Sequence, residues 1–118
     1  MPNSKQRKRG FTLVEIMIVV LIIGILLAIA VPNFITARQS SRVQTIVANL
    51  RQIDAAKEHC AMADKLSVGD VCADYTPYIK HYPPQFPVGG PLVEGAVGSY
   101  ATFRGKTADD WVADKAGL

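Results

Sequence analysis

The stretch RGFTLVEIMIVVLIIG, from Arg9 to Gly24, joins a strongly apolar run to a single carboxylate, Glu15. The sixteen residues that follow Glu15 carry no polar side chain. Phe11 to Val31 comprises 21 residues, which as a helix would be about 31 Å long and would span a membrane. Because a charge in hydrocarbon is costly and usually has a partner, the run predicts a transmembrane helix in which Glu15 has a function.

Four cations without an acid precede this run, at Lys5, Arg7, Lys8 and Arg9. Without residues 1–10, Lys and Arg fall from 13 to 9 against 10 Asp and Glu, and the net charge falls from +3 to −1. The basic character therefore belongs to this leader, and we expect no nucleic-acid partner for the rest of the chain. Since Lys and Arg beside a membrane segment stay in the cytoplasm, everything after Val31 should face outward.

Two interpretations of this N-terminus follow from composition. The first is a secretory signal peptide that is cut at the A-x-A site Ala28-Ile29-Ala30 and releases a soluble remainder. Against it, Glu15 would lie inside the hydrophobic region, the apolar run is long, and Pro32 closely follows the cut. The second is a plain single-pass anchor, in which Glu15 merely lies near the headgroups.

A third interpretation comes from resemblance. The basic leader ending in Gly10, the segment Phe11-Thr12-Leu13-Val14-Glu15, the apolar run and Pro32 resemble the N-terminus of type IV pilins and type II secretion pseudopilins. The resemblance implies that a prepilin peptidase cuts after Gly10 on the cytoplasmic face and that the new amine of Phe11 is methylated. It is strong over residues 5–38 and thin over the last fifty residues.

The same resemblance implies a function and a location. The chain would be a structural subunit of a type IV pilus-like or type II secretion pseudopilus filament, a homo-oligomer, with a minor pilin or a DNA-uptake or adhesion module as the alternative. It would start in the bacterial inner membrane with a cytoplasmic N-terminus and a periplasmic head. An inner-membrane assembly platform and a cytoplasmic ATPase would then move it into the filament.

Physical chemistry supplies a partner for Glu15 in this interpretation. Cleavage after Gly10 turns an amide into an amine on Phe11, which is cationic near neutral pH. If helices of different copies pack with an axial stagger, Glu15 of one chain meets the Phe11 amine of another, and an unpaired carboxylate there would be penalised. The pair would set the register of assembly. Gly24 and Pro32 weaken the helix, which predicts local unwinding between them; the resemblance implies that this stretch extends during assembly.

Apolar residues at three- and four-residue steps predict an amphipathic helix from Asn33 to about Lys65. The expected core stripe comprises Ile35, Val43, Ile46, Val47, Leu50, Ile53 and Cys60. The charged residues Arg38, Arg42, Arg51, Asp54 and Glu58 lie mostly off that stripe. They predict a solvated face, which in a filament would also be able to meet charges on neighbouring subunits.

We therefore expect an α+β chain in four parts: a leader (1–10), a transmembrane and assembly helix (11–32), an amphipathic helix (33–66) and a small head (67–118). The head is too short to bury much by itself, so the amphipathic helix should supply one wall of its core. Turn signals predict a loop from Tyr75 to Pro91 with a short turn at Tyr78 to His81. The resemblance implies the ladle shape of pilins.

A short hairpin is expected from Leu92 to Glu94 and from Tyr100 to Phe103. Thr107 should cap a last helix, with Asp110 three residues later and Gly117 at its end.

Cys60 and Cys72 are the only cysteines. In an oxidising compartment they would pair, contributing about 3 kcal/mol by closing a short loop; two reduced buried thiols are the alternative. Many related small pilin-like proteins carry a cysteine pair around the terminal hairpin, where this chain has Phe86 and Phe103. The resemblance therefore implies an aromatic contact in place of that covalent link.

Other sites are weakly indicated. The acids Asp109, Asp110 and Asp114 resemble calcium-binding acids of some secretion pseudopilins, although acids in the first turn of a helix also favour its dipole. The aromatics Tyr75, Tyr78, Tyr82 and Phe86 would either stack on single-stranded DNA or pack the proline-rich loop onto the head. The spacing of His59, Cys60, Cys72 and His81 matches no zinc pattern, so we expect no metal and no cofactor. The chain also lacks the common catalytic motifs, and we expect no enzyme.

Overall fold

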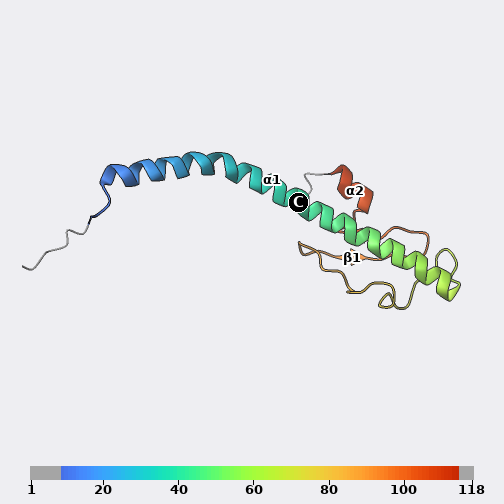
Figure 1. The fold of residues 1–118 in the computed structure, drawn as a ribbon. Helices are drawn as coiled ribbons and strands as arrows, with labels where there is room; N and C mark the ends of the chain where they lie inside the picture. The colour runs from blue at the N-terminus through green and yellow to red at the C-terminus, as the bar shows by residue number, and fades with distance from the viewer. Residues whose placement is uncertain (1–8, 115–118) are drawn as a thin grey trace, which may run out of the picture. The chain divides into compact units, whose positions relative to one another are not determined.

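The computed structural model describes residues 9–114 of the chain (Figure 1). Its elements are helix α1 (Leu13–Asp64), strand β1 (Leu92–Val93), strand β2 (Thr102–Phe103) and helix α2 (Ala108–Ala113). The expected α+β class, with a long N-terminal helix and a small hairpin, is confirmed. The chain divides into a first unit, residues 1–36, and a second unit, residues 37–118.

The first unit is the N-terminal part of α1 with the short segment before it. By length and composition, α1 is suited to cross a membrane. Within residues 9–114 it is the one helix of this kind. All of its apolar side chains in this unit are exposed, which fits a helix that is apolar on every side and is covered by lipid or by other helices. The helix is continuous through Gly24 and Pro32, so the described conformation has no unwound stretch there.

The C-terminal part of α1 forms one wall of the core of the second unit. The buried residues of α1 are Val43, Ile46, Val47, Leu50, Ile53, Ala56, Lys57 and Cys60. Most of the expected stripe is thus confirmed. The expectation is wrong for Ile35, which lies in the first unit and is 52% exposed, because the residues that cover the stripe begin to contact α1 only at Val43. Arg38 is exposed, as expected of the solvated face.

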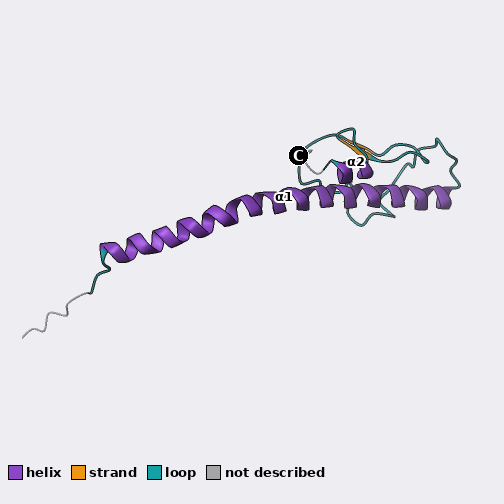
Figure 2. Cartoon of the chain, turned by 90° about the horizontal axis from the view of Figure 1, so that it is seen from above, coloured by secondary structure: helices purple, strands orange, loops and turns teal. Residues whose placement is uncertain are grey.

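The rest of the second unit packs along α1, with the hairpin and α2 beside the helix (Figure 2). The strands pair antiparallel, with Leu92 opposite Phe103 and Val93 opposite Thr102, which confirms the hairpin. The Trp111 indole N–H donates to the Phe103 carbonyl at 3.2 Å and joins α2 to this hairpin.

Helix α2 begins with the expected cap. The Thr107 hydroxyl accepts from the Asp110 N–H, while the Asp110 carboxylate accepts from the Thr107 N–H, so each residue satisfies a free group of the other. The helix ends at Ala113. The expected end at Gly117 lies outside the described residues.

The segment between α1 and β1 is a loop, as its proline content predicts. Its turn is formed two to three residues earlier than expected: the N–H groups of Tyr78 and Ile79 both donate to the Tyr75 carbonyl at 3.0 Å. Tyr75 and Ile79 are thereby buried against the core. The Asn49 side chain fixes the far part of the loop to α1 by donating to the Gln85 carbonyl at 2.9 Å.

Candidate assembly site at the N-terminus

The peptide bond between Gly10 and Phe11 lies in an accessible segment ahead of α1. Residues 9–12 have no regular secondary structure, and Phe11 is 81% exposed. A Cβ atom placed on Gly10 would meet nothing within 4 Å, so glycine is not required there by contacts within residues 9–114. An unobstructed, extended backbone is what a peptidase needs to grip.

Helix α1 begins two residues after Phe11 because Thr12 supplies a cap. Its hydroxyl accepts from the Glu15 N–H at 3.3 Å. The sequence pattern Thr12-x-x-Glu15 is typical of a capping box and would have been enough to identify this cap. Only half of the box is formed within residues 9–114, since the Glu15 carboxylate makes no return bond to the backbone.

The Glu15 carboxylate is the distinctive charge of the first unit. It is exposed and has no ion-pair partner within residues 9–114. From Arg9 to Thr36 the sequence holds two charged side chains, those of Arg9 and Glu15. A cut after Gly10 would remove Arg9 and leave Glu15 as the one charged side chain on this stretch, together with a new amine on Phe11. This stretch thus provides one negative charge, on Glu15, and the cut would provide one positive charge, on the new amine.

Gly24 and Pro32 occupy the middle and the end of the apolar helix. No atom within residues 9–114 would contact a Cβ on Gly24, so this small residue leaves room for a neighbouring helix to approach. Pro32 cannot donate to the carbonyl four residues earlier, and its own carbonyl accepts from the Thr36 hydroxyl at 3.1 Å. Gly24 and Pro32 lie on the same helix as Glu15. The part that each plays in assembly stays a prediction.

The two cysteines are joined in the structure as a disulfide, which ties the C-terminal part of α1 to the loop. Their Cα atoms are 6.3 Å apart, within the range that a disulfide spans. Asp64 lies close enough to both sulfurs for the three to resemble a metal site, but sulfurs bonded to each other are not thiolate ligands.

The three acids near the C-terminus contact different partners. Asp110 belongs to the helix cap, Asp109 lies 3.7 Å from Arg51 in an exposed ion pair, and Asp114 pairs with Lys106. Within residues 9–114 these acids do not gather as potential metal ligands. The structure therefore lends the calcium hypothesis no support. Backbone and then side-chain hydrogen bonds from Thr107 hold the pKa of Asp110 below its ordinary value.

The aromatic side chains of the loop pack inward. Tyr75 is buried and its ring lies 5.5 Å from that of Tyr82, and Phe86 stacks on Phe103 with 4.2 Å between ring centroids. Burial and the nearby Glu94 raise the pKa of the Tyr75 hydroxyl. The expected aromatic contact between Phe86 and Phe103 is present, and packing of the loop onto the core is favoured over a platform for DNA bases.

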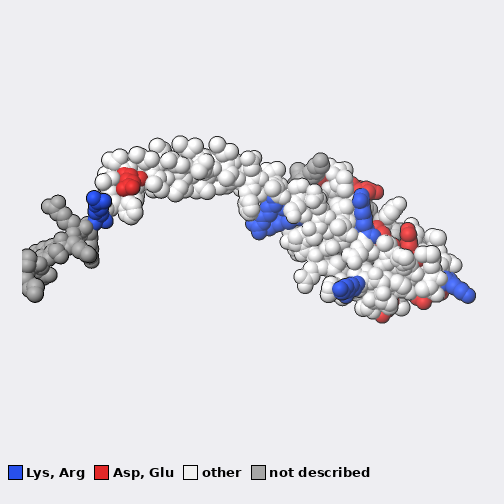
Figure 3. Space-filling model, viewed as in Figure 1, with Lys and Arg blue, Asp and Glu red and all other residues white. Residues whose placement is uncertain are grey.

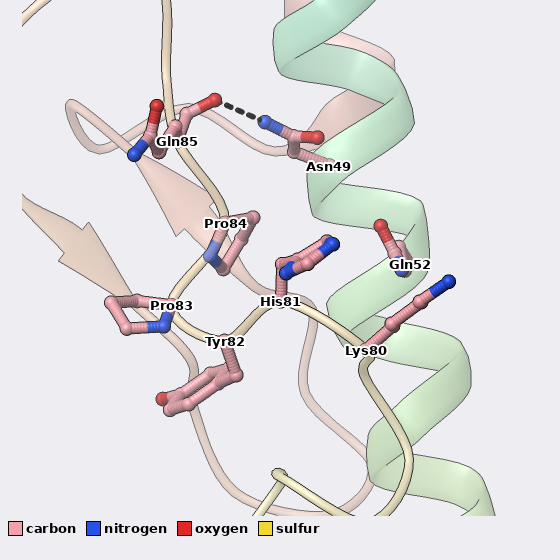
Figure 4. Close-up of a pocket in the computed structure, with 8 residues that line it drawn as sticks. All are labelled: Asn49, Gln52, Lys80, His81, Tyr82, Pro83, Pro84 and Gln85. Carbon is pink, nitrogen blue, oxygen red and sulfur yellow. Dashed lines mark hydrogen bonds between the residues drawn. The ribbon is translucent and has the colours of Figure 1, made fainter.

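A groove of about 880 Å³ lies between α1 and residues 80–85 (Figure 4). It is lined by Asn49, Gln52, Lys80, His81, Tyr82, Pro83, Pro84 and Gln85. In Figure 4 the Tyr82 ring points away from α1, whereas Lys80 and His81 lie near the helix. The groove thus combines polar side chains with the apolar surface of two prolines and a tyrosine.

Comparison with known proteins bears directly on the N-terminal segment. Residues 5–31 match the family model of the prokaryotic N-terminal methylation motif. The type IV major pilin protein PilA of Myxococcus xanthus is 52% identical over 52 residues, which are 44% of this chain and 24% of that protein. No solved structure matches the chain.

Two further relatives represent a pilus and a secretion system. The type IV major fimbrial protein FimA of Dichelobacter nodosus is 43% identical over 61 residues, 52% of this chain and 39% of that protein. The type II secretion system core protein G of Klebsiella pneumoniae is 41% identical over 51 residues, 43% of this chain and 36% of that protein. The matched region thus spans about a quarter to two fifths of these relatives, and the resemblance to type IV pilins and type II secretion pseudopilins is confirmed.

Proposed function

We propose that this chain is a structural subunit of a type IV pilus-like or type II secretion pseudopilus filament. The observation that carries the proposal is the lone carboxylate of Glu15 at the start of residues 13–36 of α1, whose side chains are all exposed, directly after an accessible Gly10–Phe11 bond. Similarity to pilins and to a type II secretion protein, together with the match of residues 5–31 to the methylation motif, supports it. The role is structural, not enzymatic.

In the proposed mechanism, the chain first inserts its apolar helix into the inner membrane with its N-terminus in the cytoplasm and its head in the periplasm. A prepilin peptidase then cuts after Gly10 and methylates the new amine on Phe11. Before the cut Glu15 has no ion-pair partner within residues 9–114; after it, the amine of a neighbouring copy can serve. Assembly is thereby made conditional on processing, since an unpaired charge between apolar helices is penalised.

Extraction from the membrane needs work that this chain does not supply. A cytoplasmic ATPase and a membrane assembly platform would provide it, and the filament would be a polymer of this same chain. The apolar helices would form the interior of that polymer, where Gly24 allows close approach. The inward packing of Tyr75, Tyr82 and Phe86 gives no support to a separate role in DNA uptake.

Intact mass of the chain after co-expression with a prepilin peptidase tests the proposal. We expect the mass of residues 11–118 plus one methyl group. A cut after Ala30, or no cut, would overturn the proposal. Gly10→Val is the matched control: because a side chain at position 10 meets nothing within 4 Å, the variant should fold normally, stay uncut and form no filaments.

A further inference from the structure

Arg38 and Arg42 form a positively charged face at the start of the second unit, here named the arginine face. They lie one helical turn apart on α1, and like charges four residues apart destabilise a helix. Neither forms an ion pair within residues 9–114, and the sequence has no acid from Ile16 to Ile53 to pair with them. Blue side chains gather at this end of the second unit in Figure 3.

A second surface surrounds Tyr100, whose side chain is 71% exposed although its backbone is held firmly. On one side the Lys57 ammonium donates to the Ser99 carbonyl at 2.7 Å. On the other side the Ala101 N–H donates to the Asp54 carboxylate at 2.7 Å. Both bonds tie the loop to α1, so the backbone at Tyr100 is held in place while its ring is exposed to solvent.

Glu58 lies beside Tyr100 between two hollows of the surface. The hollows have volumes of about 280 and 210 Å³, and Glu58, Tyr100 and Asp54 line both of them. Glu58 is exposed and forms no ion pair within residues 9–114. Glu58 and Tyr100 with these hollows are here named the tyrosine face.

The tyrosine face has the chemistry that binds a guanidinium group. Arginine stacks on an aromatic ring and pairs with a carboxylate at once, because its charge is spread over a plane. Tyrosine and arginine are also enriched among the residues that dominate protein interfaces. A tyrosine side chain on a fixed backbone has only two torsions left to order, so it loses little conformational entropy on contact.

Within one chain the two faces cannot meet. Arg42 and Glu58 are sixteen residues apart on α1, which places them about 24 Å apart along the axis and about 160° apart around it at 1.5 Å and 100° per residue. Contact between copies would therefore join two different surface patches that lie at different positions along α1. Such a heterologous contact repeats without closing when its rotation does not return to the start, and it then builds a filament.

We infer that the tyrosine face of one copy receives Arg38 and Arg42 of a second copy of this chain, side by side in the filament. The inference rests on the proposed function and assigns one of its lateral contacts. Charge complementarity, the exposed aromatic side chain on a fixed backbone and the opposed placement of the two faces carry it.

Cysteine cross-linking in assembled filaments tests the contact directly. In the processed full-length chain, Arg42→Cys combined with Tyr100→Cys should give a ladder of covalent multimers on oxidation, because each copy has one reactive group on each face. Either variant alone should give monomers only. Dimers from Arg42→Cys alone, or no ladder from the pair in filaments that assemble, would overturn the inference.

Charge reversal supplies an independent measurement. Arg38→Glu with Arg42→Glu, and separately Glu58→Arg, should each lower filament yield by roughly tenfold or more, since like charges across an interface oppose association. The three changes together should restore yield, and Lys80→Glu, an exposed cation elsewhere, should leave it unchanged. Unchanged Trp111 fluorescence of each variant in detergent would show that the second unit still folds.

The outcomes separate this inference from the proposed function. If the unaltered chain is cut after Gly10 and assembles, but reversal at Glu58 has no effect and the triple variant is not restored, the arginines contact something other than this chain, such as anionic lipid headgroups, and the inference is wrong. If the unaltered chain is not processed or forms no filaments, the proposed function itself fails.

Discussion

The two units of this chain differ in the burial of their apolar side chains, although one helix runs through both. In the first unit, isoleucine, leucine and valine side chains of α1 are exposed without exception. In the second unit, the same residue types on the same helix are buried by the loop, the hairpin and α2. Hydrophobicity in a sequence thus predicts that a residue will be covered. In the second unit the chain itself covers these residues, whereas in the first unit the proposed function assigns the covering to lipid or to other copies.

This contrast assigns different consequences to changes in the two units. A substitution in the first unit should change assembly while leaving the unfolding of the second unit as it was. A substitution in the core of the second unit should change stability first. The following experiments would contradict this division if a substitution in one unit had the effect expected of the other unit.

The largest effect is expected for Glu15→Ala, measured as the yield of sheared filaments. The variant should be cut normally after Gly10 but should leave the Phe11 amine without its counter-ion. Loss of one partner of a buried ion pair costs about 3–5 kcal/mol, and each 1.4 kcal/mol is about tenfold in an association constant. We therefore expect filament yield to fall by about a hundredfold or more, with thermal unfolding of the second unit unchanged.

Glu15→Gln sharpens that experiment, because it keeps the shape of the side chain and removes only its charge. It should fail like the alanine variant. Normal filaments from Glu15→Gln would show that the charge does not set the register, and the account of the first unit would then be wrong.

Phe103→Ala should have the largest effect on stability. The Phe103 side chain is 1% exposed, stacks on Phe86 and neighbours Trp111. Truncating a buried phenylalanine costs about 3–5 kcal/mol, which should appear in denaturant unfolding followed by the fluorescence of Trp111, the single tryptophan. Phe34→Ala is the control from the first unit: this residue is 68% exposed, and a comparable loss of stability from its removal would contradict the division.

Replacing both Cys60 and Cys72 by alanine should cost about 3 kcal/mol, as expected for a closed loop of roughly this length. The disulfide joins α1 to the loop within the second unit. Filament assembly should therefore fall only to the extent that the second unit unfolds. Unfolding of the unaltered chain with and without reductant gives the same comparison without mutation. If reductant leaves the unfolding midpoint unmoved, the two thiols are not bonded in solution.

Much of the fold was predictable because its signals are local. The three- and four-residue steps of apolar side chains predicted the buried face of α1 from Val43 onward, and Thr107 with Asp110 predicted the cap of α2. The prediction was wrong at Ile35, where periodicity continues but no residue among 9–114 covers the helix. A periodic pattern specifies a face of a helix and does not specify how far along that face the rest of the chain extends.

Long-range polar contacts were not predictable. Lys57 is buried, and its ammonium reaches Asp54 on the same helix and the carbonyl of Ser99, 42 residues away. Nothing in the sequence around Lys57 indicates this, since its partner carbonyl is a backbone group that the loop happens to bring there. The N-terminal site rests on a local signal instead, because Gly10, Phe11 and Glu15 lie within five residues of one another; their roles in cleavage and assembly stay a prediction. The position of Tyr100 beside Glu58 required the folded loop.

The smallest effect is expected for Asp110→Asn, which weakens the cap of α2. Hydrogen bonds from Thr107 hold the pKa of Asp110 below its ordinary value, so the folded state binds the proton less tightly than the unfolded state. The contribution of Asp110 is therefore present above the unfolded pKa of about 3.9 and is lost as pH falls through the lower folded pKa. The unaltered chain should exceed Asp110→Asn in denaturant midpoint at neutral pH and lose that advantage towards about pH 2.

Asp109→Asn, in the same helical turn but outside the cap, is the matched control. A difference from Asp110→Asn that is equally large at both pH values would show that the charge of the capping carboxylate is not what stabilises α2.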